Sequence, residues 1–210
     1  MKPRAVDLLR GDSNSIAPAT VVTGLAPTHL ELVERAWSGA RVDVMMNLTI
    51  GRVPGERWPQ SLHWDWSRKG PALRLLQANG VAIMCDDEWQ GIMLTLTAEH
   101  VTRADGDIGK PIVYIEFLET APWNWRIDDA GQSPRFRGVG SLLFREAVRQ
   151  SVREGFRGRV GLHALPQSEP FYERACGMSR FEPDPKVLNL VYFELTQSNV
   201  KTFLNEGASQ

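Results

Sequence analysis

A strand, a helix and a second strand follow one another between residues 112 and 165, and this order restricts the fold more than any other feature of the chain. IVYIEFLET (112–120) is β-branched and aromatic, and RVGLHAL (159–165) predicts a second strand. Between them, GVGSLLFREAVRQSVREG (138–155) places apolar residues at helical spacing, with arginines on the outer face. Two strands joined by one helix form a parallel pair with a right-handed crossover, so we expect such a pair inside a mixed sheet.

The chain after residue 80 is expected to form further strands and a helix. A hairpin is predicted from VAIMC (81–85) through the turn DDE to WQGIMLTLTAEHV (89–101), because apolar and polar positions alternate. A short helix at SEPFYERACG (168–177) and a final strand at VLNLVYFEL (187–195) complete this region. We therefore expect an α/β fold: a mixed, mostly antiparallel, twisted sheet flanked by helices, with the parallel pair at its centre.

The first 80 residues carry weaker signals. Two short helices and an extended segment are expected there, at THLELVERAW (28–37), PALRLLQANG (71–80) and RVDVMMNLTI (41–50). Thr28 would cap the first helix, and Gly80 would end the second. Residues 1–18 are rich in polar residues, Gly and Pro, so we expect a flexible amino-terminal segment. A single domain is predicted for residues 19–210.

Composition and charge argue against several classes of protein. A chain of 210 residues with 42% hydrophobic and 23% charged residues can bury one substantial core. The net charge of -1 and the pI near 6.4 make nucleic acid and anionic membranes poor partners. No apolar stretch has the length of a signal peptide core or a membrane span, so we expect a cytoplasmic protein. Cys85 and Cys176 lack the spacing of a zinc site or a disulfide framework, so no metal is expected.

SPRFRGVGSLLF (133–144) lies where the strand gives way to the helix, and it combines glycines with arginines. The first four amide hydrogens of a helix have no partner inside it, and the macrodipole adds positive charge at the same place. Gly138 and Gly140 leave the backbone bare, while Arg135 and Arg137 supply charge. The stretch therefore predicts a pyrophosphate site at the amino end of the helix.

Two familiar phosphate-binding designs do not fit this stretch. A P-loop ends in Gly-Lys-Ser/Thr, which is absent, and a dinucleotide fingerprint needs a small residue where Leu143 stands. The pattern Arg/Gln-x-x-Gly-x-Gly/Ala does fit, with Arg135, Gly138 and Gly140 in its fixed positions. Here the chain resembles the GNAT superfamily of acyl-CoA-dependent N-acetyltransferases. FYERACGM (171–178) is similar to a second segment of that family, Phe/Leu-Tyr-Glu-Arg/Lys-x-x-Gly-Phe/Met, at the expected distance.

The resemblance covers about residues 81–196 and implies an acyl-CoA-binding core there, with residues 19–80 as a variable acceptor-side part. It implies acetyl-CoA as the co-substrate, with its pyrophosphate held by Arg135, Arg137, Gly138, Val139, Gly140 and Ser141. Backbone groups of Leu118 and Thr120 would bind the pantetheine arm. The chain departs from the family pattern in the long loop WNWRIDDAGQSP (123–134) and at Leu165, near the place of a frequent Asn.

The resemblance also implies which residues move protons. Tyr172 matches the family's frequent tyrosine acid, although a Tyr on an amphipathic helix also packs its ring and bonds its hydroxyl to backbone. Glu116 lies on the side where some members place a glutamate that takes the amine proton through water. Glu116 and Glu119 point to opposite faces of the strand, and an ion pair with Arg126 or an amino-terminal arginine is the alternative. His163, in the next strand, is expected to be a hydrogen-bonded sheet residue.

Aromatic residues are candidates for the acceptor pocket. Trp123 and Asn124 directly follow the strand, and Trp64 lies in the aromatic and acidic segment HWDW (63–66), which suits a cationic amine. Alternatively, these tryptophans cover the sheet or an interface. A homodimer would fit the Trp-rich surface and is common in the resembled family. The sequence identifies neither the acceptor nor the acyl length.

The leading interpretation is transfer of an acyl group, with acetyl expected, from coenzyme A to a primary amine of a small molecule or a protein. Two alternatives stay open. One is a GNAT-like module that binds acyl-CoA for sensing or assembly with little turnover, and the other is a protein-directed modifier in a toxin or regulatory pair. The near-neutral charge disfavours a tRNA acceptor.

Overall fold

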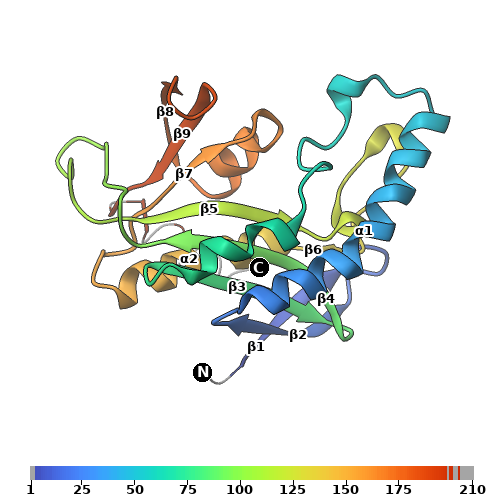
Figure 1. Cartoon of the computed structure of the whole chain (residues 1–210), viewed down its shortest axis with the longest axis horizontal. Helices are drawn as coiled ribbons and strands as arrows, with labels where there is room; N and C mark the ends of the chain where they lie inside the picture. Colours follow the sequence, from blue (N-terminus) through green and yellow to red (C-terminus); the bar gives the residue numbers. More distant parts are fainter. Residues whose placement is uncertain (1–2, 198, 201–202, 204–210) are drawn as a thin grey trace. The chain divides into compact units, whose positions relative to one another are not determined.

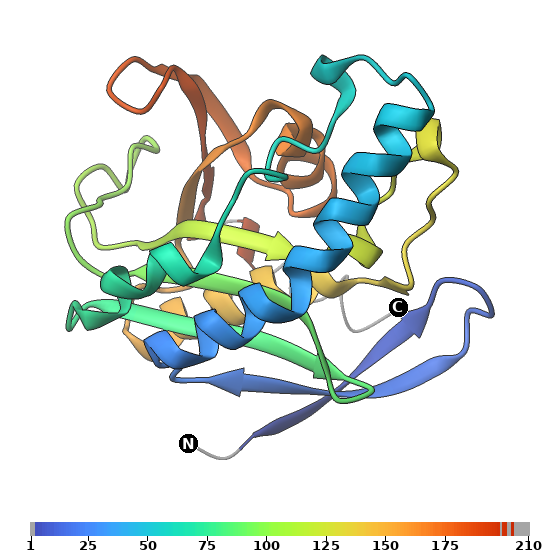
Figure 2. The same cartoon turned by 45° about the vertical axis from the view of Figure 1, so that its right-hand side comes forward.

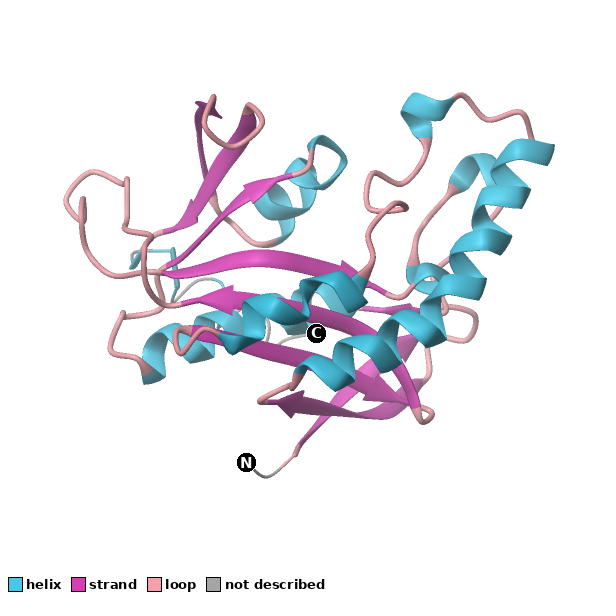
Figure 3. Ribbon diagram, viewed as in Figure 1, coloured by secondary structure: helices cyan, strands magenta, loops and turns pink. Residues whose placement is uncertain are grey.

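The computed structural model describes residues 3–197, 199, 200 and 203, and its strands form one sheet in the order β6-β1-β2-β3-β4-β5-β7-β9-β8 (Figure 1). The strands are β1 Arg4–Arg10, β2 Ile16–Thr23, β3 Ala78–Cys85, β4 Glu88–Leu96, β5 Val113–Thr120, β6 Phe136–Arg137, β7 Val160–Ala164, β8 Ser179–Asp184 and β9 Leu190–Leu195. The α-helices found in the described residues are α1 Pro27–Ile50 and α2 Val139–Arg153. Shorter helical turns lie at Gly55–Arg57, Trp66–Arg74, Pro122–Asn124, Asp128–Ala130, Pro166–Ser168 and Phe171–Ala175 (Figure 3).

The predicted parallel strand pair is confirmed. β5 and β7 run in the same direction, with Val113 opposite Val160 and Ile115 opposite Leu162, and α2 lies between them in the chain. The pairs β1–β2, β2–β3, β7–β9 and β8–β9 are antiparallel. The expected fold class, a mixed and mostly antiparallel sheet with flanking helices, is therefore correct.

Packing divides the chain into two compact units. Unit 1 contains residues 1–93 and 118–143, and unit 2 contains residues 94–117 and 144–210. Strands β4 and β5 each pass from one unit into the other. The expected acceptor-side part and acyl-CoA-binding core are defined by the ligands they would bind and not by packing. That division therefore stays a prediction.

Residues 3–18, within the segment expected to be flexible, contain β1 and the start of β2, which form a hairpin in unit 1 (Figure 2). Leu8 on β1 is buried, as are Ala17, Ala19 and Val21 on β2, so the hairpin has an inward face with the period of a strand. β1 also pairs with the two-residue strand β6. An inward face made mostly of small residues, interrupted by polar ones, gives too weak a pattern to predict from sequence.

α1 is much longer than predicted. The segment 41–50, expected to be extended, continues the helix that begins at Pro27, and the cap is Ala26 rather than Thr28. Buried positions recur every three or four residues along the whole helix: Leu30, Val33, Trp37, Arg41, Val44 and Leu48. A charged residue interrupts this apolar stripe in the sequence and β-branched residues follow it, which explains the wrong prediction.

α1 packs on the sheet of unit 1, where Figures 1 and 2 show it crossing β3 and β4. The indole Nε1 of Trp37 donates to the Trp89 carbonyl at 2.9 Å. Gly80 lies within β3 and does not end a helix, because the helical turn before it stops at Arg74. A Cβ on Gly80 would lie 2.7 Å from the Cβ of Leu25, so close packing explains this glycine.

The predicted hairpin of residues 81–101 is confirmed as β3 and β4, although β4 ends at Leu96. Its turn consists of Asp86 and Asp87, whose φ values of 53° and 60° both lie in the left-handed region. A two-residue hairpin turn of type I′ requires this conformation at both central residues.

Unit 2 has a core in which α2 supplies Phe144, Ala147 and Val148, all fully buried. The short helix predicted at 168–177 is one helical turn, Phe171–Ala175, and the final strand is confirmed as β9. Its partner β8 was not predicted, because this edge strand is largely polar and contains Pro183.

Candidate functional site

A cavity of about 550 Å³, the α2 cavity, lies at the amino end of α2 in unit 1. It is lined by Gly11, Thr120, Asn124, Arg126, Ser133, Pro134, Phe136, Arg137, Gly138, Val139 and Gly140. Six predicted coenzyme or substrate contacts are therefore brought together here: Thr120, Asn124, Arg137, Gly138, Val139 and Gly140. Gly11 and Arg126 belong to the same wall but were not among the predicted contacts.

Gly138 marks the point at which the chain turns from β6 into α2. Its φ of 84° lies in the left-handed region, and a Cβ placed on it would have no heavy atom within 4 Å. The Leu142 amide donates to the Gly138 carbonyl at 2.9 Å, so Gly138 is the residue that caps the helix. The next amides are those that lack an acceptor inside a helix. Bare backbone and the positive end of the helix dipole therefore coincide, which favours an anion.

The arginines near this turn differ in their placement. Arg137 and Arg126 line the α2 cavity. Arg135 is not part of the wall, because its Nη1 contacts Glu88 Oε2 at 2.5 Å, with both side chains less than half exposed. Arg126 and Arg137 are thus the two arginines in the cavity wall, and the phosphate contact of Arg135 stays a prediction.

The loop that forms part of the wall is held by Gln90, a fully buried residue of β4. The side-chain amide of Asn124 donates to Gln90 Oε1 at 3.0 Å, and Trp123 Nε1 donates to the same oxygen at 2.8 Å. Asn124 Oδ1 accepts from the Phe136 amide at 2.8 Å, which ties the loop to β6. Asn124 therefore has a structural role, and its contact with substrate stays a prediction.

Several predicted contacts lie outside the cavity wall. Leu118 is half-buried in β5, and Ser141 is half-buried in the first turn of α2. Trp64 packs edge-to-face on Trp66 with ring centroids 6.3 Å apart, and the Lys69 ammonium lies 4.7 Å from its ring centroid. Trp64 thus already binds a cation of the protein itself, which agrees with the structural alternative for this tryptophan.

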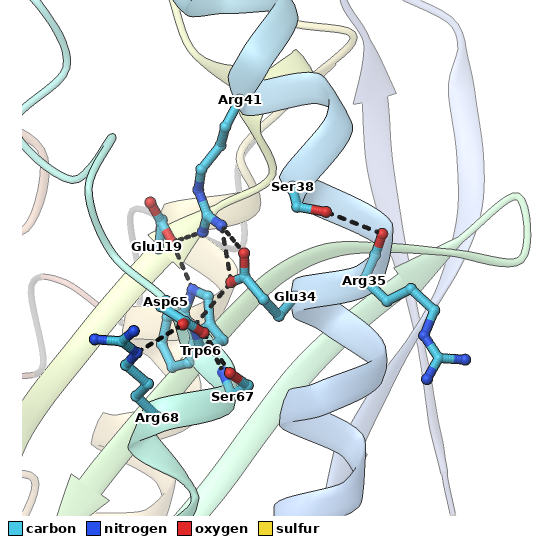
Figure 4. A network of polar contacts seen from close by, with 9 residues as sticks. All are labelled: Glu34, Arg35, Ser38, Arg41, Asp65, Trp66, Ser67, Arg68 and Glu119. Carbon is cyan, nitrogen blue, oxygen red and sulfur yellow. Dashed lines mark hydrogen bonds and ion pairs between the residues drawn. The ribbon is translucent and has the colours of Figure 1, made fainter.

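Glu119, the second glutamate of β5, joins a buried network that was not predicted (Figure 4). Its Oε2 accepts from Arg41 Nη2 at 3.0 Å and from Trp66 Nε1 at 2.5 Å. Arg41 Nη1 donates to both carboxylate oxygens of Glu34 at 2.8 Å. The Trp66 amide also donates to Glu34, at 2.8 Å. Glu119 is therefore a glutamate of β5 that forms an ion pair, and its partner is Arg41.

This network contains two carboxylates and one guanidinium. Burial raises the pKa of the Glu119 carboxyl, while the charge of Arg41 and the hydrogen bond from Trp66 oppose that shift. Glu34 and Glu119 share Arg41, so the three groups together carry a net negative charge when both carboxyls are ionised. Charge is poorly solvated in this buried region. Glu119 therefore takes up a proton more readily than an exposed glutamate does.

The two predicted catalytic residues lie in unit 2. Tyr172 is 6% exposed, and its ring centroid lies 6.4 Å from that of Phe144 and 6.3 Å from that of Phe193. Burial raises the pKa of the Tyr172 hydroxyl above its ordinary value of 10.0. Glu116 is exposed on β5. Burial of Tyr114 raises the pKa of its hydroxyl, and the negative charge of Glu116 raises it further. The catalytic roles of Tyr172 and Glu116 stay predictions.

His163 is a hydrogen-bonded residue of the sheet in unit 2, as expected. Its Nδ1 lies 2.7 Å from the Tyr114 hydroxyl, and its Nε2 lies 3.3 Å from Asp184 Oδ2. Burial lowers the pKa of the imidazole, and the charge of Arg103 lowers it further, against the effect of Asp184. Both effects favour the neutral imidazole in the folded protein, where the ring lies between the Tyr114 hydroxyl and the Asp184 carboxylate.

The described residues contain no group of three His, Cys, Asp or Glu side chains that could hold a metal ion. Cys85 and Cys176 are buried free thiols. Within the same part of the chain, none of the helices combines the length and the apolar character needed to cross a bilayer.

The sequence matches no protein-family model and no curated protein. Among solved structures, a protein described as a GNAT-family acetyltransferase from Desulfovibrio desulfuricans matches with a TM-score of 0.52 and 16% identity, covering 85% of this chain and 99% of that chain. FeeM, an N-acyl amino acid synthase from uncultured soil microbes, matches with a TM-score of 0.54 and 8% identity over 89% and 95% of the two chains. An aminoglycoside N-acetyltransferase in complex with coenzyme A has a TM-score of 0.46 and 18% identity over 76% and 85%. The strand order and the parallel pair agree with the likeness to the first two structures, and the chain shares their fold, which is that of a GNAT-family acetyltransferase.

Proposed function

We propose that this protein transfers an acyl group, with acetyl the expected one, from acetyl-CoA to a primary amine. The observation that carries the proposal is the α2 cavity, where Gly138 leaves the backbone open and Arg126 and Arg137 lie in the wall. Helix amides, bare backbone and guanidinium groups together suit a diphosphate. The likeness in fold to an acetyltransferase and to an N-acyl amino acid synthase supports acyl transfer as the chemistry.

Acyl transfer requires two proton movements. The amine nitrogen bonds to the thioester carbonyl carbon, the C–S bond breaks, the nitrogen loses a proton, and the coenzyme A thiolate gains one. We assign protonation of the thiolate to Tyr172, because it matches the family's frequent tyrosine acid and its hydroxyl, whose pKa burial raises, is protonated at neutral pH. Glu116 is assigned the amine proton, received through water. The backbones of Leu118 and Thr120 would bind the pantetheine arm.

The acceptor is proposed to be a primary amine of a small molecule or of a protein. Trp123, Asn124 and Trp64 are the candidate acceptor contacts, because aromatic faces attract an ammonium group. At Trp64 the acceptor would displace Lys69, which lies 4.7 Å from that ring.

Thermal unfolding in the presence of acetyl-CoA, coenzyme A, NAD and ATP tests the coenzyme. A ligand at 100 times its Kd stabilises the native state by about 2.7 kcal/mol, which raises the Tm of a domain of this size by about 5–10 °C. We expect acetyl-CoA and coenzyme A to give this shift, and thiol release with a panel of primary amines then measures transfer. A larger shift with NAD or ATP, or no shift with any of them, contradicts the proposal.

Two glycine substitutions form a matched pair for this experiment. Gly138→Ala and Gly106→Ala place a methyl group on backbones with φ of 84° and 82°, and both methyl groups meet open space. The backbone strain, about 1–2 kcal/mol, is therefore common to the two variants. Only Gly138 lines the α2 cavity. We expect acetyl-CoA affinity to fall about tenfold in Gly138→Ala and to stay at the wild-type value in Gly106→Ala.

A binding module with little turnover is the second candidate, favoured by the deep burial of Tyr172 among aromatic rings. Tyr172→Phe and Glu116→Gln separate the two functions, because Phe keeps the ring packing and Gln keeps the shape of the side chain. An enzyme should lose about 10²- to 10⁴-fold in rate with the Tyr172 variant while its coenzyme A affinity is retained. A sensor should show no amine-dependent thiol release in the wild-type protein.

A further inference from the structure

β1 ends beside the α2 cavity. Leu9 pairs with Arg137 and Arg10 pairs with Phe136, so the last residues of β1 hold the short strand β6 that precedes Gly138. The next residue, Gly11, lines the cavity. A strand near the amino end of the chain therefore contributes to a wall whose other residues all lie between positions 120 and 140.

Gly11 approaches the backbone of residues 134–137 closely. Its amide donates to the Arg135 carbonyl at 2.8 Å, and its carbonyl accepts from Arg137 Nη2 at 2.9 Å. A Cβ on Gly11 would lie 1.8 Å from the Pro134 carbonyl oxygen and 3.0 Å from its carbonyl carbon. No side chain fits at this position unless one of the two backbones moves. Position 11 therefore requires glycine, because a larger residue would clash with the Pro134 carbonyl.

The contact with Gly11 orients the guanidinium of Arg137. An exposed arginine loses about 2 kcal/mol of rotamer entropy when its side chain is fixed. A hydrogen bond to a carbonyl held in place by β1 reduces this cost before a ligand binds. The planar guanidinium has five N–H donors, so a group oriented through one of them can present others to a phosphate.

A second set of contacts holds the end of β1. Arg10 Nη2 lies 3.0 and 2.9 Å from the two carboxylate oxygens of Asp86, in the β3–β4 turn. The Arg10 guanidinium also lies 5.2 Å from the centroid of the Phe136 ring. β1 is thus fixed both to β6 and to a neighbouring turn of unit 1, and Gly11 is attached to a well-held strand.

We propose that the end of β1 positions the diphosphate-binding part of the site: Gly11 fixes the backbone of residues 134–137 and orients Arg137 toward the anion. This inference rests on the proposed function, because the anion is the pyrophosphate of coenzyme A. Gly11 takes no part in acyl transfer itself. It is a positioning residue that acts through Arg137 and β6.

Two acyl donors distinguish positioning of a diphosphate from general damage to the protein. Acetyl-CoA carries the diphosphate, whereas S-acetyl-pantetheine has the same thioester and lacks the diphosphate and the nucleotide. We expect Gly11→Ala to lower acetyl-CoA affinity about tenfold, to raise its KM with little change in kcat, and to leave S-acetyl-pantetheine unaffected. Gly39→Ala is the matched control, because Gly39 is exposed on α1 and its methyl group would meet open space.

Arg137→Lys provides an independent test, including the case in which Gly11→Ala fails to fold. Lysine keeps the charge and lacks the planar fork, so the same selective loss of acetyl-CoA affinity is expected if orientation matters. The double variant should lose no more acetyl-CoA affinity than the single variant with the larger loss, because both changes break the same contact. Full acetyl-CoA affinity in Arg137→Lys, or equal losses for the two donors in Gly11→Ala, would overturn the inference. A wild-type protein that binds neither donor would instead contradict the proposed function.

Discussion

Arg41 occupies a core position of α1 and carries a charge there. Its side chain is 6% exposed and lies between Glu34 and Glu119, and its guanidinium is 5.8 Å from the centroid of the Trp37 ring. The two carboxylates and the aromatic face replace the water that the guanidinium loses on burial. The arginine therefore belongs to the interior of unit 1.

Replacing Arg41 by methionine should strongly destabilise the protein. Arg41→Met keeps a long side chain at the buried position but leaves Glu34 and Glu119 without their shared cation, which costs about 3–5 kcal/mol. Urea unfolding followed by circular dichroism measures this loss. Arg35→Met, an exposed arginine on the same helix, is the control and should stay within about 0.5 kcal/mol of wild type. A loss of the same size in both variants would show that Glu34 and Glu119 do not depend on Arg41.

Single residues of the α2 cavity differ in how far sequence could identify them. Gly138, Val139 and Gly140 were predicted because a strand end, glycines and a helix start are all local features of the chain. Gly11 was missed because its requirement arises from the Pro134 backbone, which lies far away in sequence and close in space. Glu119 was seen as an exceptional carboxylate, but its partner Arg41 had been placed in an extended segment.

At the scale of elements, the β3–β4 turn combines a favourable hairpin type with an unfavourable residue. Asp87 has a φ of 60°, and Asp tolerates the left-handed region less well than glycine does. Asp-Gly is among the preferred sequences for a type I′ turn. We expect Asp87→Gly to raise the unfolding free energy by up to about 1 kcal/mol, measured by urea unfolding.

Asp87→Ala separates turn geometry from charge in that experiment. It removes the same carboxylate but keeps a Cβ at the left-handed position, so no stabilisation is expected. Equal gains in the two variants would mean that charge, and not backbone conformation, limits the stability of this turn. Asp86 is left in place because it pairs with Arg10.

Elements with a clear periodicity were predicted well, and elements held by distant partners were not. In the sequence, α2 has apolar residues at helical spacing, and β4 alternates Ile92, Leu94 and Leu96 with Met93 and Thr95. β1 and β8 contain few large apolar residues and depend on the strands beside them. The second half of α1 was missed because a buried ion pair, rather than an apolar side chain, fills one of its core positions.

At the scale of the whole molecule, the contribution of the buried histidines to stability should fall in mildly acidic solution. Burial and Arg103 hold the pKa of folded His163 below its ordinary value of 6.5, whereas the unfolded chain restores that value. As the pH falls below 6.5, the unfolded state therefore takes up a proton before the folded state does, and the unfolding free energy decreases. Above that pH the contribution of His163 is constant. Burial also lowers the pKa of His100, which acts in the same direction.

Urea unfolding between about pH 8 and pH 5.5 measures this dependence. His163→Gln cannot be protonated and keeps a hydrogen-bonding group near Tyr114, so the variant should lose less stability on acidification than the wild type does. An unchanged pH dependence in His163→Gln would show that other groups dominate the acid response.

The overall architecture was predictable because the order of strands and helices after residue 80 admits few arrangements, and the parallel β5–β7 pair follows from chain order and handedness. The segment between α1 and β3 was not predictable to the same degree. Residues 51–77 form turns and short helical segments (Figure 3), and such segments follow tertiary contacts more than local periodicity.

The hydrogen bond between Arg137 and Gly11 joins positions 126 residues apart in the chain. Closing so long a loop costs conformational entropy, and contacts of this range tend to form late in folding. During synthesis at about 5–20 residues per second, Gly11 emerges from the ribosome roughly 6–25 s before Arg137 does. A nascent chain would therefore acquire much of its secondary structure first, and the proposed binding of coenzyme A should be among the last properties to appear.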